Sequence, residues 1–176
     1  PASALQGGLV PMATLRLNTK PGSTSRLKSL AVRKTGTAFD AEVAQVRIYL
    51  ESDGDGVFSA GDTLQGANTL SGGEAPLTLA GGGAALGVAV STFHVVFSMS
   101  AEAFTNRTVG LEVSSSTSVG LEHPGRAFGP FPVVQAPIPV SDGANALNIT
   151  PTSLAPASAQ PSPDDIPMLA LRAQTA

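Results

Sequence analysis

The residues best suited to chemistry lie in one short acidic stretch, ESDGDGVFSAGD, which runs from Glu51 to Asp62. Ca²⁺ prefers about six to eight oxygen ligands, and alternate side chains of a tightly curled loop can converge on one ion. Gly56 permits the sharp turn, and Val57 would add its backbone carbonyl as a further ligand. The spacing therefore predicts a structural calcium site, whose ligands we expect to be Glu51, Asp53, Asp55, Val57, Ser59 and Asp62.

The order of these ligands matches an EF-hand-type loop. Counted from Glu51, side-chain oxygens fall at positions 1, 3, 5, 9 and 12, and glycine falls at position 6. The first and last positions differ from the EF-hand pattern. Glu51 occupies position 1, where Asp is usual, and the shorter Asp62 occupies position 12, where Glu is usual. A strand, rather than a helix, leads into the loop. A metal-free hairpin turn is the alternative interpretation, since Asp-Gly pairs favour turns. The mutual repulsion of four carboxylates within 12 residues favours the metal.

The elements that must position this loop are predicted to be short β-strands. Just before the loop, Val46, Ile48 and Leu50 share one parity, which is typical of a half-buried strand. Similar segments recur between turn signals, at 13–19, 26–34, 63–70, 77–80, 86–100, 108–113, 118–122 and 147–150. The alternation breaks near Ser29-Leu30, which predicts a bulge. The prolines of 129–140 indicate an edge strand or a connector. The spacing predicts an all-β fold, an antiparallel Ig-like β-sandwich with a C-terminal extension strand.

Composition excludes several functional classes. The chain has no cysteine, so it has no disulfide, thiolate metal site or cysteine nucleophile. No apolar run is long enough to span a membrane. A net charge of −3 gives no broad basic surface for nucleic acid. The two histidines, His94 and His123, show no spacing for a shared metal, and we interpret each as solvent-facing or packed. No catalytic motif is present, so we expect no enzymatic activity.

The two ends of the chain repeat each other. Pro1-Ala2-Ser3-Ala4 recurs as Pro156-Ala157-Ser158-Ala159, and Pro11-Met12 recurs as Pro167-Met168, with one residue inserted. We therefore expect a sandwich domain at 1–155, a linker at 156–165 and a strand at 166–176 that repeats residues 10–19. The apolar residues of this strand are Ile166, Met168, Leu169, Leu171 and Ala173. An isolated strand must pair with something, either the next domain of a tandem protein or a neighbouring subunit by strand donation. A disordered tail is the alternative.

The stretch VRIYLESDGDGVFSAGDTLQG, preceded by LKSLAVRKTGTAFDAEVAQ, resembles the repeat module of large secreted and cell-surface prokaryotic proteins. The motif TPTSLAPAS at 150–158 is similar to the linker between such repeats. The resemblance covers most of residues 10–158. It implies a β-sandwich, an extracellular location and a structural or adhesive role without catalysis.

From these features we expect an extracellular structural protein. It would be a calcium-stabilised sandwich that joins copies of itself, through its terminal strand, into a fibre or a surface layer. Its partners would be those copies, or a tandem neighbour, with no nucleic acid and no membrane span. The alternative is an adhesion or carbohydrate-binding module of a large secreted protein, with loops at one end of the sandwich forming the site. Because the chain begins at Pro1 without a signal peptide, we also expect it to be a processed form or a fragment.

Overall fold

The computed structural model describes residues 1–122, 125–143, 147–153 and 169–175 and divides the chain into two units. The first unit is Pro1–Ser141 and the second is Asp142–Ala176. The predicted linker at 156–165 lies outside the described residues, as do Ile166, Met168 and His123.

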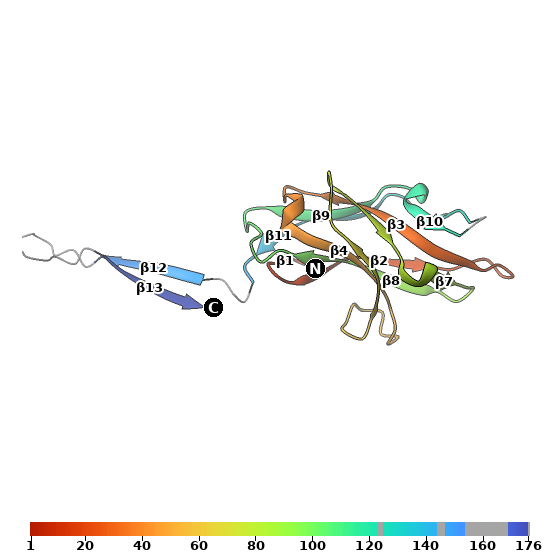
Figure 1. Ribbon diagram of the computed structural model, residues 1–176, viewed down its shortest axis with the longest axis horizontal. Helices are drawn as coiled ribbons and strands as arrows, with labels where there is room; N and C mark the ends of the chain where they lie inside the picture. The colour runs from red at the N-terminus through yellow and green to blue at the C-terminus, as the bar shows by residue number, and fades with distance from the viewer. Residues whose placement is uncertain (123–124, 144–146, 154–168, 176) are drawn as a thin grey trace, which may run out of the picture. The chain divides into compact units, whose positions relative to one another are not determined.

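Two β-sheets build the first unit, and Figure 1 shows them as two layers. The 7-stranded sheet contains β1 (Ala4–Leu5), β3 (Ser25–Thr35), β6 (Glu74–Thr78), β7 (Ala84–Leu86), β9 (Thr108–Val113), β10 (Val119–Leu121) and β11 (Val133–Ser141). The 4-stranded sheet has the order β2 (Leu9–Leu17), β8 (Ser91–Met99), β4 (Val43–Leu50) and β5 (Thr63–Asn68). Short 3₁₀ turns lie at Asp40–Glu42, Ala80–Gly82 and Ser116–Ser118. The pairing is antiparallel except between β1 and β11, where Ala4 lies opposite Val140 in parallel register.

The core lies between the two sheets and comes from the alternation that the sequence shows. Val46 and Ile48 of β4, with Phe93, Val95 and Phe97 of β8, are fully buried. They face fully buried side chains of the other sheet, which are Leu27, Leu30, Leu77, Val109, Leu111 and Val113. Burying each such side chain contributes roughly 1.5–3 kcal/mol. The predicted all-β sandwich is therefore confirmed.

A β-bulge corrects the parity of β3, close to where the sequence predicted it. Gly120 of β10 pairs with Ser29, but the next residue, Leu121, pairs with Leu27. Lys28 is therefore the extra residue, which lets Leu27 and Leu30 both point inward although their parities differ.

The second unit contains one two-stranded antiparallel sheet. Its strands are β12 (Leu147–Ser153) and β13 (Leu169–Thr175), in register from Leu147 opposite Thr175 to Ser153 opposite Leu169. We expected the sandwich to extend to residue 155 with Leu147–Thr150 as its last strand; the structure pairs this segment with β13 instead. The backbone of the C-terminal strand, which includes Leu169, Leu171 and Ala173, thus has a partner within the chain. Pairing with another copy stays a prediction.

Candidate functional site

The acidic loop joins β4 to β5, whose ends pair at Leu50 and Thr63. Figure 1 shows it in gold, projecting from the ends of these strands. The loop packs on the outer face of the 4-stranded sheet through Phe58. The Phe58 ring centroid lies 4.9 Å from that of Tyr49 and 6.2 Å from that of His94. Tyr49 and His94 lie opposite each other on neighbouring strands and point away from the core. They are nevertheless buried, at 9% and 1% exposure, because the loop covers them.

Glu51 and Asp62 use their carboxylates to hold the loop backbone. Oε1 of Glu51 accepts hydrogen bonds from the backbone N–H groups of Asp53 and Gly54, at 3.2 and 2.9 Å. Asp62 accepts from the backbone N–H groups of Ser52 and Ser59, at 3.2 and 2.9 Å. Both carboxylates are largely buried, with Glu51 at 9% side-chain exposure. The two acids therefore close the loop at its beginning and its end.

His94 connects the beginning of this loop to the sheet beneath it. Its Nε2 lies 3.3 Å from Oε2 of Glu51, and its Nδ1 lies 3.1 Å from Oγ1 of Thr14 on β2. Because a carboxylate only accepts hydrogen bonds, Nε2 is the donor to Glu51, and in the neutral ring Nδ1 accepts from Thr14. The sequence placed His94 on the outer face of its strand but did not connect it with the acidic loop. The one sequence feature that could have indicated this contact is Phe58, an apolar residue within the acidic loop that is expected to pack against a neighbouring surface.

Asp53 and Asp55 occupy the exposed tip. The Ser59 hydroxyl donates to Oδ2 of Asp53 at 2.8 Å, and the backbone N–H of Asp55 donates to Oδ1 at 3.3 Å. These bonds, the Ser59 bond most of all, lower the pKa of Asp53 below its ordinary value of 3.8. Gly54 and Gly56 adopt φ values of +83° and +74°, so the two turns of the tip use the left-handed region that glycine favours.

The loop brings metal-ligating atoms together in two overlapping groups. The first is Glu51, Asp53 and Asp55, and the second is Glu51, Asp62 and His94; within each group the ligand atoms lie within 4.8 Å of one another. Glu51 belongs to both. These clusters can hold a metal ion, and carboxylate oxygens suit hard cations. The Val57 carbonyl and the Ser59 hydroxyl stay predicted ligands.

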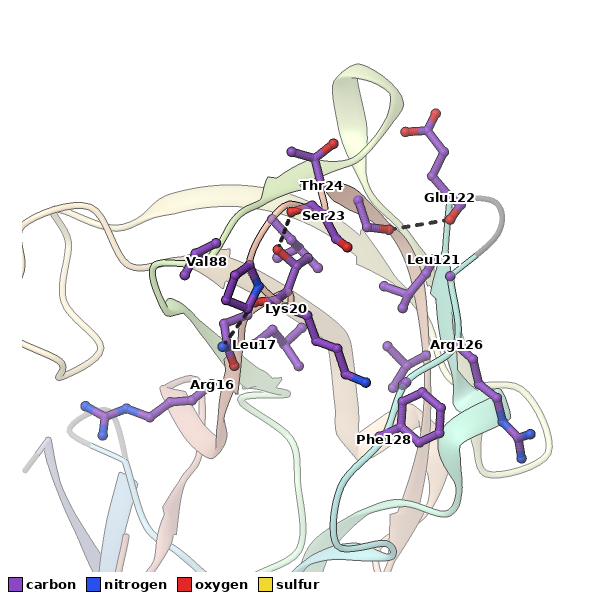
Figure 2. Close-up of a pocket in the computed structure, with 18 residues that line it drawn as sticks. Arg16, Leu17, Lys20, Ser23, Thr24, Val88, Leu121, Glu122, Arg126 and Phe128 are labelled. Atoms are coloured by element: carbon purple, nitrogen blue, oxygen red, sulfur yellow. Dashed lines mark hydrogen bonds between the residues drawn. The ribbon is translucent and has the colours of Figure 1, made fainter.

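A cleft at one end of the sandwich is a second candidate site. Its volume is about 670 Å³, and it is lined by the turn between β2 and β3, by Val88, by Leu121 at the end of β10, and by Arg126 and Phe128 beyond that strand. Figure 2 shows the Lys20 side chain pointing into the cleft toward the Phe128 ring. Phe128 is 84% exposed. Sequence analysis did not identify this site, because its walls come from three separate parts of the chain.

Within the described residues, none of the helices combines the length and apolar character that crossing a membrane would need.

Comparison with known proteins places the chain by fold. No family model and no curated protein matches it. A solved structure, "Hadza microbial sialidase Hz136", is similar with a TM-score of 0.51 and 14% sequence identity. The match covers 82% of this chain and 31% of the sialidase, so the chain spans about a third of that protein's length. At this identity the likeness shows a shared all-β sandwich fold.

Proposed function

We propose that this chain is a non-catalytic structural module of an extracellular protein, a β-sandwich whose acidic loop is stabilised by Ca²⁺. The observation that carries the proposal is the convergence of Glu51, Asp53 and Asp55, whose ligand oxygens lie within 4.8 Å of one another. These residues hold loop positions 1, 3 and 5. Three carboxylates at this distance repel one another, and a divalent cation between them converts the repulsion into attraction.

The proposal extends to the residues that would hold the ion. Glu51, Asp53 and Asp55 would be direct ligands, with the Val57 carbonyl and Ser59 completing the set. Asp62 already accepts two backbone hydrogen bonds, and one of its carboxylate oxygens lies within 4.8 Å of the ligand atoms of Glu51 and His94. Bound Ca²⁺ would stiffen the loop that covers His94 and Tyr49, so the metal would stabilise the sheet as well as the loop.

The calcium proposal is tested by thermal unfolding in CaCl₂ and in chelator. A ligand at one hundred times its Kd stabilises the folded state by about 2.7 kcal/mol, so the melting temperature should rise by several degrees. The rise should be absent in Asp55→Asn and retained in Glu102→Gln, which removes one exposed carboxylate elsewhere. An unchanged melting temperature in the unaltered chain would overturn the proposal.

We further propose that the terminal strand joins the module to other copies. Its support is the repeat of residues 10–19 near the C-terminus, together with the pairing of β13 in a sheet of only two strands. A two-stranded sheet is marginally stable in water, so adding a strand from another copy would stabilise it. Light scattering and electron microscopy in Ca²⁺ should show assembly of residues 1–176 and not of a chain ending at Ser141. Assembly by both chains, or by neither, would refute strand-mediated joining.

Carbohydrate binding is a second candidate function, favoured by the cleft. Loops at one end of the sandwich form it, and Phe128 supplies the exposed aromatic ring that sugar-binding sites use. Binding to any member of a glycan array, lost in Phe128→Ala, would support this candidate. Its outcome is independent of the calcium and assembly tests.

A further inference from the structure

The cleft has the size and lining of a ligand site. Its volume of about 670 Å³ falls within the range of roughly 300–1,000 Å³ typical of small-molecule pockets. Leu17, Leu121 and Ala127 give it an apolar lining, and Val88 at its edge is 54% exposed. Such pockets combine an apolar lining with a few polar groups that orient the ligand.

The charge of the cleft is positive and largely unpaired. Three cations line it, Arg16, Lys20 and Arg126. Among the described lining residues Glu122 is the one acid, and it already forms an ion pair with Lys28 at 3.2 Å. Neither Arg16 nor Lys20 has a carboxylate partner within the part of the chain that the structure describes. The cleft therefore has cationic charge available for an anionic ligand.

Of these cations, Lys20 is the one whose charged group points into the cleft. In Figure 2 its ammonium group points into the cleft between Leu17 and Phe128, whereas the Arg16 and Arg126 guanidinium groups point outward from the rim. An ammonium group beside apolar side chains attracts an anion more strongly than one in bulk water. Lys20 would thus hold the charged group, and the two arginines would add a positive field around it.

The remaining features fit a sugar ring. Phe128 presents its ring at the mouth of the cleft, with the Arg126 guanidinium 5.9 Å from the ring centroid. The C–H face of a pyranose packs on such a ring, since both surfaces are apolar. Ser23 and Thr24 carry exposed hydroxyl groups at the rim, and each can donate and accept hydrogen bonds.

We propose that this cleft binds an acidic saccharide, with Lys20 pairing with the sugar carboxylate and Phe128 packing against the ring. The inference rests on the second candidate function and not on the calcium-stabilised structural role. Lys20 would thus select acidic saccharides over neutral ones.

The test is calorimetric titration of the full chain at low salt with trigalacturonate and with a hyaluronan tetrasaccharide, each compared with its methyl-esterified form. We expect the acids to bind at least tenfold more tightly than the esters. Lys20→Gln should remove this preference, and Phe128→Ala should weaken acid and ester alike. Arg33→Gln, which removes one exposed positive charge from β3 outside the cleft, should leave both affinities within twofold of the unaltered chain.

The outcomes distinguish failure of the Lys20 assignment from failure of carbohydrate binding itself. Equal binding of acid and ester, or an unchanged preference in Lys20→Gln, would overturn the assignment of Lys20 while carbohydrate binding stands. Binding of neither form would overturn both. An equal loss in Arg33→Gln would show that net charge alone, and not the cleft, attracts the acid.

Discussion

Replacement of Glu51 by Ala in chelator should destabilise the sandwich, although it removes one of several mutually repelling carboxylates. Glu51 accepts two backbone hydrogen bonds from the loop and one from His94, and its side chain is only 9% exposed. In chelator no ion is bound, so Glu51 stabilises the loop only through these three hydrogen bonds. The loss of stability in Glu51→Ala therefore measures how much these bonds contribute before any ion binds.

The expected magnitude follows from opposing terms. Each backbone bond to the carboxylate lies at the exposed loop and is worth about 1 kcal/mol, while His94, 1% exposed, loses a partner for a buried N–H at about 1–3 kcal/mol. Against this, removing Glu51 relieves repulsion from Asp53 and Asp55, which in water amounts to about 1 kcal/mol before salt screening. The net loss should be about 2–4 kcal/mol, or roughly 4–16 °C in melting temperature at about 2–4 °C per kcal/mol.

Urea unfolding with a constant m value is the assay. Glu51→Gln keeps one acceptor oxygen for the two backbone bonds, and its NH₂ group can donate to Nε2 of His94 when the ring takes the tautomer in which Nδ1 donates to Thr14. It should therefore lose less than half as much stability as Glu51→Ala. Glu102→Ala serves as the control for loss of an exposed carboxylate and should stay within about 0.5 kcal/mol of the unaltered chain. A neutral or stabilising effect of Glu51→Ala would show that repulsion dominates, and the reasoning about the loop would then be wrong.

Two further predictions concern the loop tip and the turns. Ser59→Ala should raise the pKa of Asp53 toward its ordinary value, because the Ser59 hydroxyl is the main cause of the lowering; a carboxyl ¹³C NMR titration in chelator measures it. Because the pKa of Asp53 is lowered in the folded state, the Asp53 carboxylate stabilises the fold above pH 3.8, and this stabilisation is lost as the pH falls through the folded pKa. Ser59→Ala should make this stabilisation smaller. Gly36→Ala should destabilise more than Gly22→Ala: both residues have positive φ, but an added Cβ at Gly36 would lie 2.5 Å from the Thr108 carbonyl oxygen, whereas at Gly22 it meets nothing within 4 Å. Urea unfolding should show a loss of about 1–2 kcal/mol for Gly22→Ala and a clearly larger one for Gly36→Ala, and equal losses would contradict the steric argument.

Local patterns were enough to predict the sandwich. Val46 and Ile48 alternate with polar neighbours, and that period-2 pattern directs them to the core whatever strand lies beside them. The break in parity near Ser29 likewise predicts a bulge without knowledge of the partner strand. The acidic loop was predictable for the same reason, since the convergence of Glu51, Asp53 and Asp55 depends on a turn of a few residues.

Only the tertiary structure decided what these elements contact. The alternation of its strand predicts that His94 faces outward, which it does. It is nevertheless buried, because the loop that follows β4 folds back over β8 and places Phe58 against it. The cleft likewise exists only where the turn after β2 meets Val88 and the segment ending at Phe128, which lie far apart in the sequence. The C-terminal strand pairs with β12 in antiparallel register, and nothing within the sequence of β13 specifies that partner. Periodicity determines which face a side chain takes, whereas burial of an outer face depends on where distant segments pass over it.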